Sequence, residues 1–277
     1  MTGRIPARTA KLAVTLAVVS AVFAVMAVAA SAATVVYNNV PKPLPGNVQS
    51  IGFQATSAAE FGGQIEATGP VNNPVVTVGM SSWACETGGA TDGSCVTTPG
   101  ATFNVPITLN VYSVGAGNSV GTKLVTLTQN FAIPYRPSAD NVNCAENGGW
   151  FKKGKNGGCF HGKLFTIKFA KLGTNRAPLT LPAKTIVSVA FNTFTHGYAP
   201  TGAEGPYDSL NVALTEPLVE GEPVLPSVGS NPAPEDAYYN STFGGFYCDG
   251  GAGGTGTFRL DSGCWTGEQP LIKVKSN

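Results

Sequence analysis

The chain has 277 residues, of which 12% are charged, and its 17 basic and 16 acidic side chains leave a net charge of +1. This sparse, balanced charge excludes the electrostatic footprint typical of nucleic-acid-binding proteins, so we expect no nucleic-acid partner. Thirty-five glycines and twenty prolines divide the sequence into short segments and argue against a helical protein. The basic cluster Lys152, Lys153, Lys155 and Lys163 is interpreted as a solvated loop edge.

Residues 1–32 have the features of a cleavable export signal. Arg4, Arg8 and Lys11 precede an uncharged apolar stretch that ends in small residues. Cleavage would remove these three bases and no acid, leaving a net charge of about −2 on residues 33–277. The apolar stretch is also long enough to span a bilayer, so a retained anchor stays open. Because no hydrophobic tail closes the sequence, we expect a secreted, extracellular protein without a stable membrane anchor after cleavage.

Beyond the signal, alternating apolar and polar residues predict strands, and no stretch has helical periodicity. The predicted strands are, in chain order, 51–55, 64–67, 75–80, 107–112, 123–131, 164–169, 185–191, 210–214, 257–260 and 271–274. Such a series without helices predicts an all-β fold with two packed antiparallel sheets, a β-sandwich of jelly-roll-like form with disulfide-closed loops. The Pro-rich stretch 216–234 is expected to be a crossing connection inside the single domain 33–277.

Six cysteines form three pairs that are close in sequence. An even number of cysteines after an export signal predicts disulfides. Sequence does not fix their connectivity, but sequential pairing is favoured because each pair brackets a turn-rich loop. The pairs are Cys85–Cys95, Cys144–Cys159 and Cys248–Cys264. The alternative, a thiolate zinc site, lacks the C-x-x-C spacing of zinc ribbons.

Each cysteine loop has a tryptophan in it or beside it. In the structural interpretation the indoles of Trp83, Trp150 and Trp265 cover disulfides and close the ends of the sandwich. In the functional interpretation they stack on sugar rings, with neighbouring polar groups supplying hydrogen bonds. The structural interpretation is stronger for Trp83. If the protein binds a ligand, the predicted contacts are Trp150, Tyr247, Asp249, Asp261 and Trp265.

Two strings match known motifs outside the context that those motifs need. Residues 251–256 read G-x-G-x-x-G and residues 117–121 read G-x-S-x-G. Both motifs require a turn from a strand into a helix, whereas a strand is predicted after each string. We interpret the first as a loop between cysteines and the second as a hairpin loop. The only histidines, His161 and His196, have no recognisable catalytic context.

Acidic residues near the C-terminus leave an enzymatic alternative open. They are Glu235, Asp236, Asp249 and Asp261, with His196 and Asp208 upstream. Glycoside hydrolysis needs two carboxyl groups across a cleft, but acids in turn-rich loops, as these are interpreted, are usually solvated or bonded to backbone N–H groups. Asp249 and Asp261 are also the residues that, with loop carbonyls, would hold calcium. No D-x-D-x-D-G string supports that site, and we expect no other cofactor.

Three segments resemble recurring pieces of one group of proteins. Residues 131–137 (FAIPYRP), 207–214 (YDSLNVAL) and 257–261 (TFRLD) are similar to segments of exported bacterial, chiefly actinobacterial, β-sandwich proteins of uncharacterised function. The resemblance would cover most of the mature chain. It implies export and the fold, and it identifies no catalytic residue.

Two function classes follow. The first is a secreted non-catalytic β-sandwich module whose partner is an extracellular glycan or a cell-surface component, or which has a structural role in the envelope. The alternative is a secreted polysaccharide-active enzyme that uses a carboxylate pair. A cleft with two close carboxyl groups, one with a raised pKa, would favour the enzyme. Exposed aromatic rings without such a pair would favour the binding module.

Overall fold

A computed structural model describes residues 1–3, 33–154, 157–170, 172–173, 177–191, 210–215 and 224–277. Nearly all of the predicted export signal lies outside these residues, as do Lys155, His196 and Asp208. Ala32–Asn277 forms one compact unit. Among the residues described, no helix combines the length and the apolarity needed to cross a membrane.

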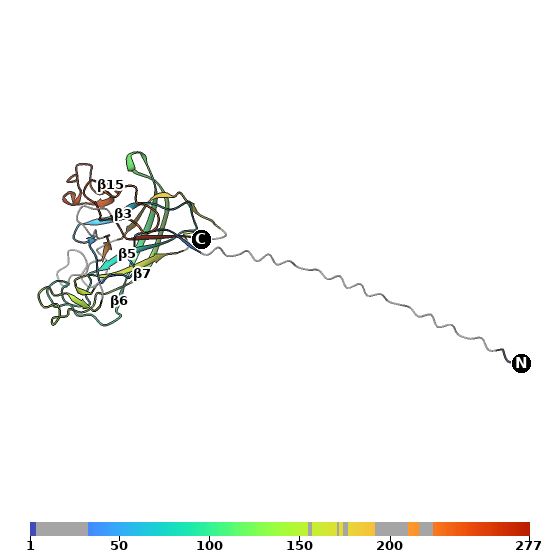
Figure 1. Cartoon of the computed structure of the whole chain (residues 1–277), viewed down its shortest axis with the longest axis horizontal. Helices are drawn as coiled ribbons and strands as arrows, with labels where there is room; N and C mark the ends of the chain where they lie inside the picture. The colour runs from blue at the N-terminus through green and yellow to red at the C-terminus, as the bar shows by residue number, and fades with distance from the viewer. Residues whose placement is uncertain (4–32, 155–156, 171, 174–176, 192–209, 216–223) are drawn as a thin grey trace. The chain divides into compact units, whose positions relative to one another are not determined.

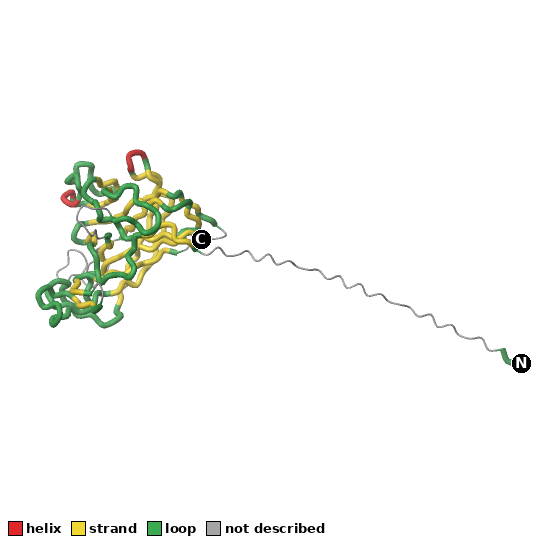
Figure 2. Tube along the Cα trace, viewed as in Figure 1, coloured by secondary structure: helices red, strands yellow, loops and turns green. Residues whose placement is uncertain are grey.

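The predicted all-β sandwich is confirmed, with the strands gathered between two groups of loops (Figure 2). Sheet A consists of β10 (Lys163–Phe169), β5 (Val75–Ser82), β16 (Ile272–Ser276), β1 (Thr34–Asn38), β13 (Leu210–Ala213) and β2 (Ser50–Gly52). Sheet B consists, in order, of β15 (Arg259–Ser262), β14 (Asp236–Ser241), β3 (Ala58–Glu66), β12 (Lys184–Ala190), β6 (Thr102–Val114) and β7 (Val120–Pro134). The minor elements are β4 (Val71–Asn72), β11 (Thr180–Leu181), β8 (Trp150–Lys152), β9 (Gly158–Phe160) and the short 3-10 turns η1 (Ala116–Asn118) and η2 (Gly244–Phe246).

The strand order is that of a jelly roll. In sheet A the order β1-β16-β5-β10 pairs the first strand with the last, and sheet B contains the order β3-β12-β6-β7. The chain therefore passes repeatedly from one sheet to the other, as jelly rolls do, and every strand pairing is antiparallel. Between β12 and β16 the chain adds β13 to sheet A and the β14–β15 pair to sheet B (Figure 1).

The core lies between the two sheets, as strand alternation requires. In β5 the side chains of Val76, Val78 and Met80 are buried in it, and in β3 those of Phe61 and Ile65 are. The residues between these positions point to the outer faces of the sandwich. Each sheet thus has an outer face with a composition of its own, and these two faces carry the candidate sites.

In the two large sheets, β1 and β14 lie where no strand was predicted, and the short strands β4, β8, β9 and β11 were not predicted either. The prediction that Asp236 belongs to a turn-rich loop is wrong, because Asp236 begins β14 and is buried, with the Ser262 hydroxyl donating to its Oδ1 at 2.5 Å. The stretch DAYYNS escaped detection because it is fully packed and does not alternate. The predicted hairpin at residues 117–121 is confirmed: η1 joins β6 to β7, where Val114 pairs with Val120.

Candidate binding site

All three predicted disulfides are confirmed: Cys85–Cys95, Cys144–Cys159 and Cys248–Cys264. No cysteine is free, so no thiolate is left for a zinc site. Trp83 packs against the Cys85–Cys95 disulfide and donates from Nε1 to the Ser81 hydroxyl at 3.1 Å. This contact agrees with the structural interpretation of Trp83.

The first two disulfide loops lie against each other. The fully buried guanidinium of Arg136 donates to the carbonyl of Ala90 in the first loop and to that of Gly148 in the second. The Asn141 amide adds a bond to the Gly93 carbonyl at 3.0 Å. Trp150 is half-buried in β8 and donates from Nε1 to the Gly162 carbonyl at 2.8 Å. This end of the sandwich is therefore fixed by side chains that bind backbone carbonyls.

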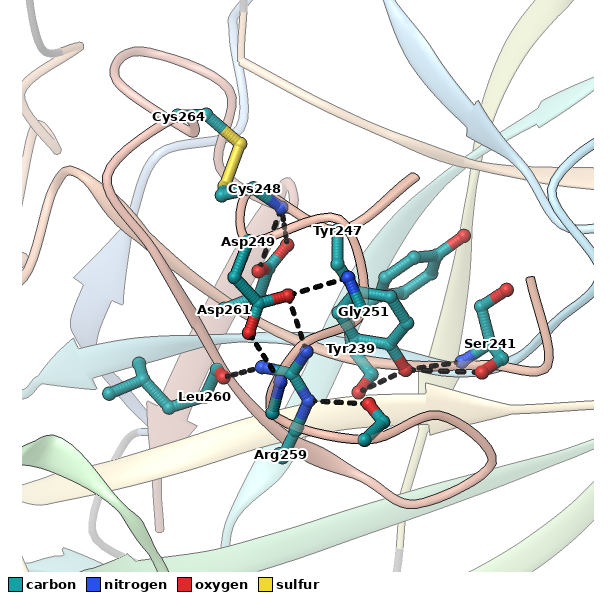
Figure 3. Close-up of polar contacts among 12 residues, drawn as sticks. Tyr239, Ser241, Tyr247, Cys248, Asp249, Gly251, Arg259, Leu260, Asp261 and Cys264 are labelled. Carbon is teal, nitrogen blue, oxygen red and sulfur yellow. Dashed lines mark hydrogen bonds and ion pairs between the residues drawn. A yellow bond between two sulfur atoms is a disulfide. The ribbon is translucent and has the colours of Figure 1, made fainter. Parts of the chain in front are cut away.

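The third loop is organised by Arg259 (Figure 3). Its guanidinium forms an ion pair with Asp249 at 2.8 Å, donates to two backbone carbonyls and lies 4.2 Å from the ring centre of Tyr247. Asp249 also accepts hydrogen bonds from the backbone N–H groups of Gly251 and Gly253. The run 251–256 is thus a closed loop around an ion pair, as its interpretation as a loop between cysteines requires.

Three of the predicted contact residues lie inside the protein. Trp265 is 7% exposed, packs 5.2 Å from the ring of Phe61, and donates from Nε1 to Asp261 at 2.8 Å. Asp261 is 1% exposed and also accepts from the Cys248 backbone N–H. The hydroxyl of the buried Tyr247 accepts from the Ser241 N–H at 2.8 Å (Figure 3). In these positions the side chains support the loop, and the ring of Trp265 has no open face for a sugar.

The two acids of the third loop have opposite pKa shifts. The Arg259 guanidinium lowers the pKa of Asp249, whereas burial raises the pKa of Asp261 against the effect of its hydrogen bonds. Opposed pKa values mark acid–base pairs in enzymes. Here, however, both oxygens of each carboxylate already accept hydrogen bonds from the loop itself. A catalytic or calcium-binding role would therefore have to share these carboxylate oxygens with the donors of the loop.

A different group of polar side chains lies on the outer face of sheet B. In β3, Phe61 and Ile65 point into the core, so Glu60, Gly62 and Gln64 point outward. Glu60 is nevertheless only 8% exposed and Gln64 only 1%. A carboxylate is seldom buried so far unless its charge is satisfied by hydrogen bonds. The surroundings of Glu60 provide them.

One oxygen of Glu60 accepts three hydrogen bonds. Asn110 Nδ2 donates to Oε1 at 2.8 Å, the Tyr112 hydroxyl at 2.9 Å and the Ser188 hydroxyl at 2.5 Å. Burial, reinforced by the charge of Glu60, raises the pKa of Tyr112, so this hydroxyl keeps its proton and remains a donor. No described residue donates to the second oxygen, Oε2. The carboxylate is therefore held firmly on one side and has acceptor capacity left on the other.

The register of sheet B explains how these donors converge. Ser188 lies opposite Gly62 on β3 and opposite Asn110 on β6, so the three strands bring their side chains to one place. A Cβ atom on Gly62 would lie 2.6 Å from the Cβ of Ser188, so only glycine allows the two strands to approach this closely. Asn110 Oδ1 and Gln64 Nε2 are buried without a partner among the described residues. Unsatisfied polar atoms of this kind are rare in packed structures and point to a role beyond stability.

Two exposed aromatic rings lie in the segment that follows β14 of sheet B. Asn240 of β14 pairs with Glu60, and shortly beyond it Phe243 and Phe246 are 55% and 42% exposed. Their ring centres are 5.2 Å apart, and the rings are tilted by 59°. Of the predicted contact rings in this region, Tyr247 and Trp265 are buried, whereas Phe243 and Phe246, which precede Cys248, reach the surface. The candidate site, called the Glu60 site below, comprises Glu60, Asn110, Tyr112, Ser188, Asn240, Phe243 and Phe246.

Sequence reasoning missed Glu60, although a signal was present. Residues 58–66 read AAEFGGQIE, where one acid precedes a pair of glycines inside an apolar segment. An acid in such a strand must find partners on neighbouring strands, but the sequence does not say which strands are neighbours. Searches with the whole chain against protein-family models, curated proteins and solved structures find no significant match. The functional argument therefore rests on the geometry.

Proposed function

We propose that the protein is an exported, non-catalytic β-sandwich module that binds a neutral, hydroxyl-rich glycan at the Glu60 site. The observation that carries the proposal is the buried Glu60 carboxylate, fixed on one oxygen by three donors. A sugar hydroxyl is a suitable donor for the remaining oxygen, because a charge-assisted hydrogen bond is about twice as strong as a neutral one. A carboxylate held in place in advance also loses little entropy on binding.

The exposed pair Phe243 and Phe246 supports a carbohydrate ligand. A sugar ring has an apolar C–H face that packs on an aromatic ring, while its hydroxyls need polar partners at the side. The two rings follow β14, the strand whose Asn240 pairs with Glu60. The half-buried Thr108 of β6 and the exposed Thr128 of β7 pair on the same outer face and extend the polar surface.

Export is part of the proposal and has two supports. The three disulfides are the bonds expected of a protein that matures outside the reducing cytoplasm. The basic, apolar and small-residue order of positions 1–32 is that of an export signal. The polysaccharide-active enzyme is less well supported, because the acids of the third loop are occupied by the donors of their own loop.

Binding of a panel of neutral hexose and pentose oligosaccharides to the mature, oxidised protein tests the proposal. We expect at least one member of the panel to bind, and Glu60→Gln to weaken that binding about tenfold or more, since the amide carries no charge. The double change Phe243→Ala/Phe246→Ala should weaken it similarly without lowering the melting temperature. Phe151→Ala is the matched control, because Phe151 is 37% exposed but belongs to the second loop.

Two results would contradict the proposal. One is that no oligosaccharide of the panel binds. The other is that the Glu60 and double phenylalanine variants bind as well as the parent protein does. Product analysis on the same samples separates the two function classes: cleavage of an oligosaccharide by the parent protein but not by Glu60→Gln would establish the enzyme instead.

A further inference from the structure

The outer face of sheet A carries a row of lysines that the sequence does not reveal. Thr77 of the central strand β5 pairs with Lys168 on β10 and with Lys273 on β16. Directly paired residues of antiparallel strands point to the same face. Lys168, Thr77 and Lys273 therefore form one row across three strands, although their positions lie up to 196 residues apart in the sequence.

Two more lysines extend this row into a groove. Lys275 lies two residues beyond Lys273 on β16 and so points to the same face, and Lys42 comes from the segment that follows β1. The groove has a volume of about 320 Å³. Its polar lining includes Lys42, Thr77, Thr166, Lys168, Lys273 and Lys275. This volume lies at the lower end of the range for ligand sites, which suits a short stretch of a chain.

The wall of the groove is held rigidly. Val40 and Leu44 pack on the buried cluster of Leu164, Ala213 and Leu271, and the Lys152 ammonium donates to the Leu44 carbonyl at 2.9 Å. Asn39 binds the backbone on both sides of Leu271, donating to the Pro270 carbonyl at 2.9 Å and accepting from the Ile272 N–H at 2.6 Å. A groove fixed in this way needs no rearrangement to receive a ligand, which lowers the entropy lost on binding.

The charge of the groove is uncompensated. Four of its lining residues are lysines, and none of its described lining residues is acidic. The mature chain as a whole is expected to be slightly acidic, so this local excess is a feature of the face and not of the composition. A concave surface lined by one sign of charge concentrates ligands of the opposite sign and increases their association rates.

We infer that this groove binds an acidic polysaccharide, a chain whose sugars carry carboxylates. Residues two apart on a strand are about 6.7 Å apart, and residues two strands apart are about 9.6 Å apart. Lys275 lies along β16 from Lys273, and Lys168 lies across the sheet from it, so one bound chain can contact several of these ammonium groups at once. Thr77 and Thr166 supply hydroxyls for the uncharged groups of such a chain.

The lining argues against a nucleic acid. Single-stranded nucleic acids bind to aromatic platforms on which the bases stack, and arginine forks are favoured for phosphate. The described lining residues include neither an aromatic side chain nor an arginine. The inference is independent of the proposed glycan site on sheet B, which lies on the other sheet and contains a carboxylate.

Oligogalacturonate is the probe, with a neutral galactose oligomer of equal length as the reference ligand. We expect the parent protein to bind the uronate and not the reference, and the affinity to fall as salt concentration rises. Lys273→Gln/Lys275→Gln should lower the affinity for the uronate about tenfold or more, as loss of two contacting charges does near an anionic surface. The control Lys153→Gln/Lys184→Gln makes the same change in net charge at exposed lysines outside the groove.

The outcomes separate this inference from the proposed function. Glu60→Gln should leave binding of oligogalacturonate unchanged, whereas it weakens binding of neutral glycans about tenfold or more if the Glu60 site is correct. Equal losses from the groove variant and the control variant would overturn the inference, and so would the absence of uronate binding. Inorganic polyphosphate or single-stranded DNA bound as tightly as the uronate would also overturn it, because the groove would then select only negative charge.

Discussion

The two outer faces of the sandwich hold their polar groups in opposite ways. On sheet B the Glu60 carboxylate is nine-tenths buried and hydrogen-bonded by three neighbours, so its position is set by packing. On sheet A the lysines Lys168 and Lys273 reach into a groove open to solvent, and their effect is set by charge. The difference teaches that one fold can fix the polar groups of one face by packing and leave the charged groups of the other face in contact with solvent. Substitutions should therefore affect stability on the first face and salt-dependent binding on the second.

The largest effect on stability is expected at Trp265, which follows the third disulfide loop and packs in the core between the sheets. Trp265→Ala would empty the space beside Phe61 and Tyr239 and leave the buried Asp261 without one of its donors. Large-to-small changes of this kind cost about 3–5 kcal/mol of the free energy of unfolding. Urea unfolding of the oxidised protein measures it, and Trp150→Ala, at a half-buried ring, should lose clearly less. Equal stability of the Trp265 variant and the parent protein would show that the indole is not a support.

Glu60→Ala comes next and tests whether the polar groups on sheet B depend on one another. The change leaves the amide of Asn110 and the hydroxyls of Tyr112 and Ser188 without their acceptor, and a buried unsatisfied donor costs about 1–3 kcal/mol. We expect a loss of about 2–3 kcal/mol, because the three donors relax together. Glu66→Ala, at the half-buried end of the same strand, is the control and should change stability little. If Glu60→Ala and Glu66→Ala lower the free energy of unfolding equally, the hydrogen bonds to Glu60 do not stabilise the outer face of sheet B.

Much of the fold could be predicted from the sequence because its signals are local. Period-two runs such as 123–131 and 164–169 reveal strands without knowledge of their neighbours, and the cysteine pairs bracket their own loops. Strand β14 was missed because both of its faces are covered, so DAYYNS shows no alternation. Period-two signals thus identify strands with one open face most directly, and β14, which is covered on both faces, escaped them.

The candidate sites could not be predicted in the same way, because they are made by pairing between distant strands. Glu60 meets Ser188 only through the β3–β12 pairing, and Lys168 meets Lys273 only across β5. The third loop misled for a related reason: Trp265 and Tyr247 are adjacent to polar residues in sequence, yet they face the core. Residue type and sequence neighbours therefore do not reveal which aromatic rings are exposed, because exposure depends on packing against distant strands.

Stability should also depend on pH, to a smaller extent, through the two acids of the third loop. Both have a pKa of about 3.8 when unperturbed. Asp249 has a lowered pKa, so its stabilising contribution is present above pH 3.8 and is lost as the pH falls through the pKa of the folded state. Asp261 has a raised pKa, so its favourable contribution is present below pH 3.8 and is lost as the pH rises through its pKa in the folded state.

Urea unfolding of Asp249→Asn and Asp261→Asn across this range tests the signs. The advantage of the parent protein over Asp249→Asn should grow as the pH rises through the lowered pKa of Asp249 towards pH 3.8. Its advantage over Asp261→Asn should shrink as the pH rises from 3.8 through the raised pKa of Asp261. Parallel profiles for the two variants would mean that Arg259 and burial do not shift these carboxyl groups in opposite directions.

The smallest change in stability is expected on sheet A, and its sign is the opposite of that on sheet B. Lys273 and Lys275 share one face with Lys168 and have no acidic partner among the described groove residues, so they repel one another. Like charges on neighbouring positions of a sheet are destabilising, and exposed pairs are worth only about 0.2–1 kcal/mol. Lys273→Gln/Lys275→Gln should therefore leave stability unchanged or raise it by about 0.3 kcal/mol at low salt, with the gain disappearing as salt is added. A loss of stability in this variant would mean that the lysine stems are packing groups, because a groove maintained for charge should be more stable when its charge is removed.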